Sequence, residues 1–207
     1  MTGDSLIWAL AVLSFATAMA ATPGPNNAML AASGASFGFR RTLPHMLGVT
    51  IGFPMLILTV DLGAGAALRS MPWVETAMRW VGIAYLLWLA WKIARARPDG
   101  AHAARGRPLT FMQAALFQWV NPKGWVAAFG AIMAYATEVG SRHVAQALTI
   151  AAIFFLVSLP CTAFWIAVGA GVARFLRAPD AVRRFNLAMA LLLLASLVPA
   201  VIEAVRG

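Results

Sequence analysis

The hydrophobic positions of this chain fall into six long runs separated by short polar segments, at residues 6–39, 43–68, 73–93, 109–136, 144–172 and 185–205. A helix needs roughly 20 apolar residues to cross the ~30 Å hydrocarbon core of a bilayer. The pattern therefore predicts an all-α integral membrane protein with six transmembrane helices. The first run, of 34 residues, and the fourth, of 28, are too long for one straight crossing. Both contain polar interruptions, so we expect the first and fourth helices to be broken.

The first interruption is the hexapeptide Thr22-Pro23-Gly24-Pro25-Asn26-Asn27. Proline has no backbone N–H and clashes with the carbonyl group four residues earlier, and glycine is a poor helix former, so Pro23, Gly24 and Pro25 predict opened backbone. Broken backbone at membrane depth is tolerated only where it is buried in protein or lines a wet cavity. We expect a substrate to occupy that cavity.

The second interruption is the stretch Gln118-Trp119-Val120-Asn121-Pro122-Lys123-Gly124-Trp125, in the fourth run. Pro122 and Gly124 predict a second opening of the helix for the same reasons. The break therefore recurs in the second half of the chain.

With three spans in each half, the two halves enter the membrane from opposite sides and form two inverted three-helix repeats. We expect one transmembrane transporter domain over residues 1–207, with repeat 1 at about 1–94, a cytoplasmic linker at about 95–108 and repeat 2 at about 109–207. A pair of discontinuous helices in corresponding positions indicates a binding site near the bilayer midplane.

At the first break, Asn26 and Asn27 supply hydrogen-bond donors and acceptors without net charge. The helix expected to begin near Ala28 directs unpaired N–H groups back at the gap. Such an N-terminus attracts a carboxylate, and the carboxylate of an amino acid fits this geometry. The alternative is that the two asparagines cap the interrupted helix. We favour substrate binding because two adjacent amides exceed what capping needs.

At the second break, Lys123 is a cation with at least ten mostly apolar residues on either side. A buried ammonium group needs a partner: it can hold a substrate carboxylate, pair with Asp61, or alternate between the two. Alternatively, its long stem reaches the membrane interface. Asn121 is expected to pair with exposed backbone in either case. The candidate substrate-binding residues are therefore Asn26, Asn27, Asn121 and Lys123.

Asp61 lies near the end of the second run and is our candidate for ion coupling. If Asp61 lies several residues inside the hydrocarbon, desolvation would favour its protonated form and make it a proton carrier. At the outer interface it would simply be wetted by headgroups. The two alternatives depend on its depth.

Composition supports a membrane protein: 61% of residues are hydrophobic, 11% are charged, and the mean hydropathy is +0.78. The net charge of +9 does not indicate nucleic acid, because the cations lie in short loops between spans. Eleven of them fall in the loops after the first, third and fifth spans, against at most four on the other side, so both termini are predicted to be periplasmic. The eleven are Arg40, Arg41, Lys92, Arg95, Arg97, Arg105, Arg107, Arg174, Arg177, Arg183 and Arg184.

No metal, cofactor or catalytic site is expected. Cys161 is the only cysteine, and the sequence has no Cys/His cluster with metal-ligand spacing. It also has no His-Glu-x-x-His pair and no Gly-x-Ser-x-Gly elbow. The small-residue face at Ala163, Ala167 and Gly171 is compatible with packing inside the chain or with a homodimer.

The motifs at 22–27 and 121–125, in a six-span chain of this size, resemble those of the lysine exporter (LysE/RhtB) family of bacterial amino-acid exporters. The stretches at 36–40 (Ser-Phe-Gly-Phe-Arg) and 45–52 (His-Met-Leu-Gly-Val-Thr-Ile-Gly) extend the resemblance. It implies export of amino acids or related small metabolites across the inner membrane, driven by an ion gradient.

The sequence therefore predicts a secondary exporter that works by alternating access and is coupled to protons. The rivals are a membrane-embedded enzyme acting on lipid or peptide, and a passive channel for small solutes. Concentrative transport separates these functions, because neither rival accumulates an unmodified solute against its gradient.

Overall fold

The computed structural model describes residues 3–64, 71–95, 107–138, 141–176 and 179–206. Within these ranges the chain forms eight α-helices and no strand, which confirms the all-α class. Four segments are long and apolar enough to cross a membrane: Asp4–Ala21, Phe39–Gly63, Arg142–Arg174 and Asp180–Val198.

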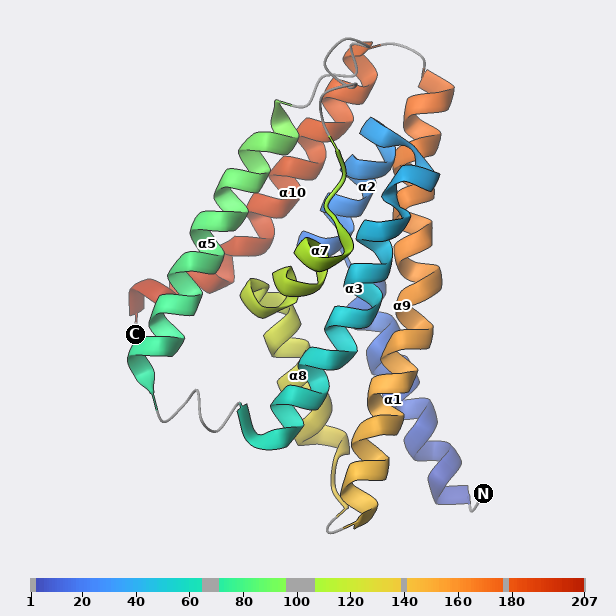
Figure 1. The fold of residues 1–207 in the computed structure, drawn as a ribbon, viewed down its shortest axis with the longest axis vertical. Coiled ribbons are helices and arrows are strands. Elements are labelled where there is room, and N and C mark those ends of the chain that lie inside the picture. Colours follow the sequence, from blue (N-terminus) through green and yellow to red (C-terminus); the bar gives the residue numbers. More distant parts are fainter. Residues whose placement is uncertain (1–2, 65–70, 96–106, 139–140, 177–178, 207) are drawn as a thin grey trace.

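In the first half of the chain, α1 (Gly3–Ala21) and α2 (Pro25–Phe37) follow each other from one end of the molecule to the other (Figure 1). Helix α3 (Phe39–Thr59) returns and continues into a single π-helical turn, Val60–Ala64. Helix α5 (Pro72–Ala94) then runs back in the direction of α2.

The second half runs in the opposite sense (Figure 1). Helix α7 (Phe111–Phe117), a 3-10 turn (Gln118–Val120) and α8 (Pro122–Tyr135) descend toward the end where α1 begins. Helix α9 (Ser141–Leu176) ascends and α10 (Pro179–Arg206) descends. The expected linker lies mostly outside the described residues, which omit 96–106.

Both predicted helix breaks are present. Residues 22–24 separate α1 from α2, and the 3-10 turn with Asn121 separates α7 from α8. Helices α2 and α8 each begin at a proline, Pro25 and Pro122. The expected start near Ala28 was three residues late, because proline lacks the N–H that a first helical residue leaves unpaired and has the φ that a helix needs.

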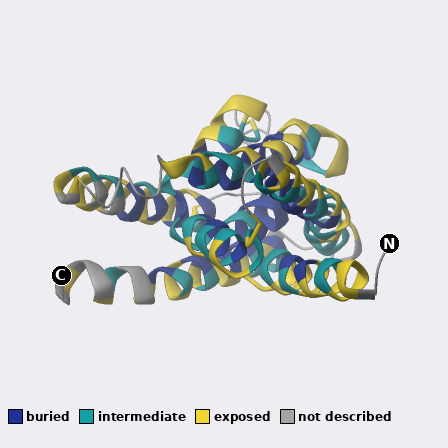
Figure 2. Cartoon of the chain, turned by 90° about the horizontal axis from the view of Figure 1, so that it is seen from below, coloured by how far each residue is buried: buried dark blue, intermediate teal, exposed yellow. Residues whose placement is uncertain are grey.

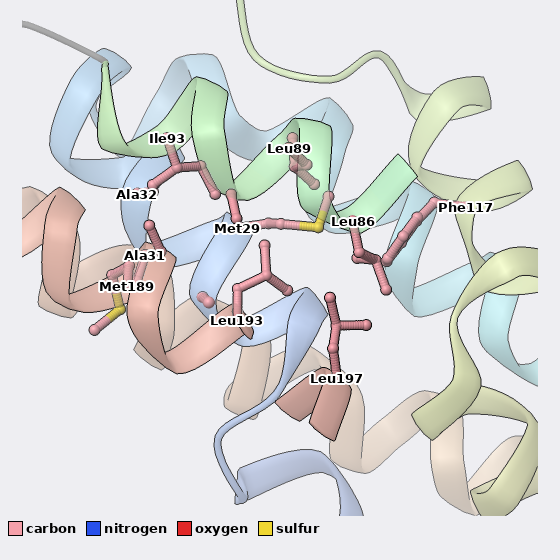
Figure 3. Packing of buried hydrophobic residues seen from close by; sticks show 13 residues of the cluster. Met29, Ala31, Ala32, Leu86, Leu89, Ile93, Phe117, Met189, Leu193 and Leu197 are labelled. Atoms are coloured by element: carbon pink, nitrogen blue, oxygen red, sulfur yellow. The ribbon is translucent and has the colours of Figure 1, made fainter. Parts of the chain in front are cut away.

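Helix α2 lies at the centre of the molecule and is buried along most of its length (Figure 2). One face packs between α5 and α10, where Met29 contacts a cluster that includes Leu86, Leu89 and Leu193 (Figure 3). Another face lies against α9 so closely that a Cβ atom at Gly34 would collide with the backbone of Ile166. This packing fixes the position of the first break.

Helix α7 is held in the same manner by α3. A Cβ atom at Gly48 would collide with the carbonyl oxygen of Phe111, and one at Gly52 would lie 2.7 Å from the Cα of Ala115. Glycines at this spacing let two helix backbones approach closely. The second break is therefore anchored on α3 just as the first is anchored on α9.

Candidate functional site

A cavity of about 60 Å³ lies where the two breaks meet. This is room for roughly four water molecules. Its walls come from the end of α1, both breaks, α3, α8 and α9, and Lys123 is the one charged residue among them. The lining residues are Met19, Ala20, Gly24, Asn26, Asn27, Val49, Phe53, Asn121, Lys123, Gly124, Ala127, Phe154, Ser158 and Thr162.

Two helix N-termini meet at this cavity. The residues that precede α2 and α8 are Gly24 and Asn121, and neither helix has a side-chain capping hydrogen bond or an acidic residue in its first turn. The first N–H groups of a helix have no partner inside it, and its dipole places partial positive charge there. The cavity wall therefore carries partial positive charge at the starts of α2 and α8, beside the carbonyl oxygens that follow the end of α1.

A reciprocal amide pair joins the two breaks. The Nδ2 of Asn26 donates to the Oε1 of Gln118 at 2.9 Å, and the Nε2 of Gln118 donates to the Oδ1 of Asn26 at 3.2 Å. The same Nε2 also donates to the carbonyl oxygen of Ala114 at 2.8 Å. Gln118 is fully buried, so this pair fixes the separation of the breaks in a water-poor interior.

Asn27 satisfies backbone groups that the first break leaves open. Its Nδ2 donates to the carbonyl oxygens of Ala20 and Thr22, both at 2.8 Å. The last carbonyl groups of a helix have no partner inside it. Both amide hydrogens of Asn27 are thereby used within the protein, and only its Oδ1 remains to receive a ligand.

Lys123 reaches across from the second break to the first. Its Nζ donates to the carbonyl oxygen and to the Oγ1 of Thr22, both at 2.8 Å, and to the carbonyl oxygen of Pro23 at 3.4 Å. A cation at the end of α1 is favoured by the negative end of the helix dipole. Its aliphatic stem lies against Gly24, where an added Cβ would be 2.7 Å from the lysine Cδ.

Asn121, a residue of the cavity wall, has a buried polar atom without a hydrogen-bond partner among the described residues. The residue is 2% exposed, and its Oδ1 has no hydrogen-bond partner among the described residues. The expectation that this side chain pairs with exposed backbone was wrong for the oxygen, because the backbone N–H groups of Gly124 and Trp125 bond to the Asn121 main-chain carbonyl instead. A buried acceptor without a partner costs about 1–3 kcal/mol, which a ligand donor would recover.

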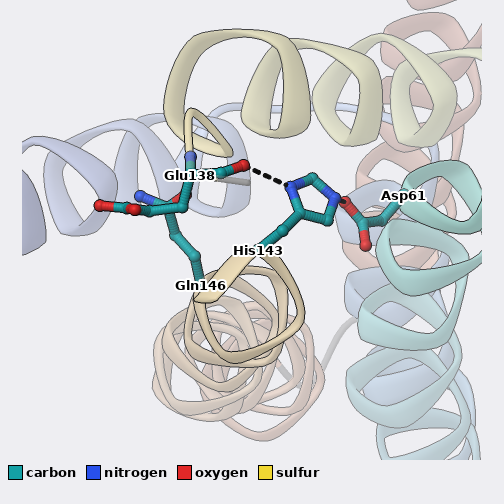
Figure 4. Close-up of polar contacts among 4 residues, drawn as sticks. All are labelled: Asp61, Glu138, His143 and Gln146. Carbon is teal, nitrogen blue, oxygen red and sulfur yellow. Dashed lines mark hydrogen bonds and ion pairs between the residues drawn. The ribbon is translucent and has the colours of Figure 1, made fainter. Parts of the chain in front are cut away.

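Asp61 lies outside this cavity, in the π-helical turn after α3. Its Oδ1 is 2.8 Å from the Nε2 of His143 in the first turn of α9 (Figure 4). Among the described residues its ion pair is therefore with His143, and the Lys123 ammonium is held by Thr22.

The sequence matches the family described as LysE type translocator over residues 17–198 of its 207 residues. This chain belongs to that family. The family is named for translocation, the movement of a substrate across a membrane. The expected family is thereby confirmed. No solved structure matches the chain.

Several relatives of this chain are named as bacterial efflux proteins. The cysteine/O-acetylserine efflux protein of Salmonella typhimurium is 36% identical over 105 residues, which are 50% of this chain and 53% of the relative. The protein of the same name from Escherichia coli (strain K12) is 33% identical over 120 residues, 58% of this chain and 60% of the relative. The matches thus span little more than half of the relatives' length.

In this LysE-type translocator, the four candidate substrate-binding residues all line one cavity, together with Gly24 and Gly124. Pro23 lies in the first break, and Pro25 and Pro122 are the first residues of α2 and α8. Asp61 is the one candidate that the fold separates from the rest. Within the described residues, no group of three or more His, Cys, Asp or Glu side chains is placed to hold a metal ion.

Three polar residues that contact the candidates through their side chains were not themselves candidates: Thr22, Gln118 and His143. Thr22 and Gln118 lie inside the two interrupted stretches. Their polar side chains within apolar runs could therefore have indicated them as site residues. His143 carried no such signal, because its partner Asp61 lies 82 positions earlier in the chain.

Proposed function

We propose that this protein is a secondary active exporter of amino acids or related small metabolites across the bacterial inner membrane, driven by protons and working by alternating access. The observation that carries the proposal is the cavity between two uncapped helix N-termini, with Lys123 as its single charged lining residue. Such a wall favours a carboxylate over a cation or a neutral solute.

The proposed architecture has six crossings, in which α1 with α2 and α7 with α8 each make one. Residues 1–207 then form one domain of two inverted repeats. The opposite directions of the two halves support this arrangement (Figure 1). Arginines at the start of α3 and lysine or arginine at the end of α5 and α9 lie at one end of the bundle. By the positive-inside rule this end is cytoplasmic, and both termini are periplasmic.

The substrate that fits best is a small amino acid with an uncharged side chain. Its carboxylate would lie between Lys123 and the two N-termini, and its ammonium group would donate to the free Oδ1 of Asn121. The apolar walls formed by Val49, Phe53 and Phe154 would receive a short side chain. Cysteine and O-acetylserine, which the relatives are named for, have this chemistry, so we propose them as the first substrates to test.

In the proposed cycle, the Lys123 ammonium exchanges its partners. It is held by the Thr22 oxygens when the cavity holds no carboxylate, and a carboxylate that enters would compete for it. Because Thr22 directly follows α1 and Lys123 lies in the first turn of α8, loading the cavity would loosen a contact between the two halves. We propose that this step permits the change of access.

The test is uptake into proteoliposomes that contain the purified protein, with labelled cysteine, O-acetylserine and a panel of other amino acids, with and without a proton gradient. We expect gradient-driven accumulation of at least one panel member. Lys123→Met, which keeps the apolar stem and removes the charge, should reduce the initial rate by a factor of ten or more, on the order of one charged hydrogen bond.

Lys92→Met is the matched control, because the Lys92 ammonium stacks on the Trp88 ring at 4.9 Å on an exposed part of α5, outside the cavity. It should transport at the wild-type rate. Full transport by Lys123→Met would contradict the assigned role. Equilibration without accumulation would indicate a passive channel, and a chemically altered solute would indicate an enzyme.

A further inference from the structure

The pair formed by Asp61 and His143 lies at the end of the bundle where α3 ends and α9 begins, which we call the outer end. The Asp61 side chain is 7% exposed and that of His143 is 34% exposed. The Nε2 of His143 lies 2.8 Å from the Oδ1 of Asp61, which is an ion-pair distance, and this oxygen is buried and has no hydrogen bond among the described residues. The Nδ1 of His143 faces the carbonyl oxygen of Glu138 at 3.0 Å (Figure 4). Each nitrogen of the imidazole ring therefore has one oxygen within 3.0 Å.

For both contacts to be hydrogen bonds, Asp61 and His143 together need one more proton than an ionised carboxylate and a neutral imidazole carry. A carbonyl oxygen and an ionised carboxylate only accept hydrogen bonds, whereas a neutral imidazole has a single N–H. Both contacts form if the ring is an imidazolium. They also form if the Nδ1–H donates to Glu138 while a protonated Asp61 donates to Nε2. Without the extra proton, one of the two imidazole nitrogens has no hydrogen and faces an oxygen that is also only an acceptor.

The contact joins three helices that line the cavity. The N–H of Glu138 donates to the Oε1 of Gln146 at 2.9 Å. Side chains of α9 therefore contact both the backbone N–H and the backbone carbonyl group of Glu138, in the turn after α8. His143 then links this turn to Asp61 at the end of α3. Between the pair and the cavity lies an apolar cluster that includes Val60, Ile150 and Phe154.

Phe154 both belongs to this cluster and lines the cavity. Its ring contacts those of Phe53 and Phe15, with centroids 5.3 and 6.1 Å away. Ring contacts thus connect the cavity wall to the apolar cluster beneath the pair, and Asp61 and His143 join α3 and α9, which carry Phe53 and Phe154.

The other charged or titratable side chains described at this end are exposed or directed elsewhere, so none of them takes the place of Asp61 or His143 in the contact. Asp4 is exposed in the first turn of α1, and the Tyr135 ring at the end of α8 packs on Phe15 at 5.7 Å. Glu138 and Arg142 are exposed, and Figure 4 shows the Glu138 carboxylate directed away from His143. The described part of α3 has no further titratable side chain near this end.

We propose that Asp61 and His143 form a proton-binding site that closes the outer end of the cavity. One proton shared between Asp61 Oδ1 and His143 Nε2 holds α3 to α9 and to the turn after α8. When the proton leaves to the outer solution, past the partly exposed imidazole, the contact is lost and the outer end opens. The proposal rests on the exporter function only for naming this side periplasmic.

The test measures access to the cavity instead of transport. Ser158, a small buried residue of the cavity wall, is replaced by cysteine in a Cys161→Ala background. A charged, membrane-impermeant thiol reagent is added to vesicles of either orientation between about pH 5.5 and about pH 8.5, the range in which imidazoles titrate. At each pH the labelling rate is divided by that of the same protein with Asp61→Asn, which cancels the pH dependence of the thiol.

Asparagine at position 61 can donate to the Nε2 of a neutral His143 while the Nδ1–H donates to Glu138, so this variant keeps both contacts without the extra proton. We expect the ratio of labelling rates to rise about tenfold from low to high pH, in one vesicle orientation only. A factor of about ten is what the loss of one charged hydrogen bond would produce. His143→Ala should label rapidly at every pH. Arg142→Gln, which removes a neighbouring exposed charge, should follow the wild type.

A ratio that stays constant over this pH range would overturn the proposal, even if His143→Ala failed to fold, because Asp61→Asn keeps the contact. The result is independent of any substrate. A constant ratio together with gradient-driven export would remove the proton-binding site and leave the proposed function. A pH-dependent ratio without export of any panel member would do the reverse.

Discussion

Helices α2 and α8 both follow a break and both begin at a proline, yet they are buried to very different extents. In α2 every residue from position 27 to 35 is buried, whereas α8 buries only Gly124, Ala127, Ala128 and Ala131. Val126 and Met133 of α8 are 67% and 76% exposed. Protein surrounds α2, whereas α8 has one face toward the surroundings. A shift of α8 therefore disturbs less packing than a shift of α2.

The two breaks also differ in what they offer each other. The first presents oxygens, namely the carbonyl groups of Ala20, Thr22 and Pro23, and it relies on Asn27 and Lys123 to satisfy them. The second is tightened by a 3-10 turn and supplies the cation. Neither break is complete alone, because the acceptors of one are paired by a donor from the other.

The largest effect is expected from glycines on the two helices. Gly34→Ala in α2 places a Cβ against the Ile166 backbone, which cannot move without separating α2 from α9. We expect a loss of about 3 kcal/mol, or a fall of roughly 10 °C in Tm of the detergent-solubilised protein. In α8, Gly130→Ala places a Cβ 3.1 Å from the Phe15 ring, which can turn aside. Its Tm should stay within about 2 °C of wild type.

A thermal unfolding scan of both variants in the same detergent measures this difference. Equal Tm shifts would show that α2 and α8 are equally constrained and would remove the basis for treating α8 as the more movable helix.

An intermediate effect is expected from the asparagines. Asn27→Ala removes two hydrogen bonds and leaves the carbonyl group of Ala20 without that partner, at a cost of about 1–3 kcal/mol and a Tm lower by roughly 3–8 °C. Asn121→Ala removes an Oδ1 that has no hydrogen-bond partner among the described residues. It should leave Tm within about 2 °C and slow transport about tenfold, by loss of one bond to substrate. Unfolding scans and proteoliposome uptake on both variants separate structure from binding, and a large Tm fall for Asn121→Ala would contradict the comparison.

The smallest effect is expected at Gly24, where the two breaks touch. The φ of Gly24 is −179°, an extended value that any residue adopts, so alanine is opposed only by the Lys123 stem, 2.7 Å from the added Cβ. A flexible lysine can move aside, and we expect a two- to fivefold rise in the KM of uptake with little change in Tm. The same substitution in a Lys123→Met background should have a smaller effect, and equal effects in both backgrounds would show that the lysine contact is not the cause.

The sequence allowed the all-α class, both helix breaks and the family to be predicted, because prolines and apolar run lengths act locally. It also singled out the four residues at the cavity, since amides and a lysine are rare inside apolar runs. It did not predict that α2 begins at Pro25, nor that the oxygen of Asn121 stays without a partner. The first follows from the local preference of proline for the first helical position. The second depends on which neighbouring groups lie close to the oxygen in the folded chain.

By itself, then, the sequence determined where the helices must open, because proline cannot continue the hydrogen-bond ladder in any surroundings. Only the tertiary structure decided which side chains pair with the groups at each helix break. Asn26 meets Gln118 across 92 positions and Lys123 meets Thr22 across 101. Asp61 could have been assigned to Lys123 by charge alone, yet the packing of α3 on α9 gives it to His143. Charge sets what a group requires, and packing distance sets which partner can meet the requirement.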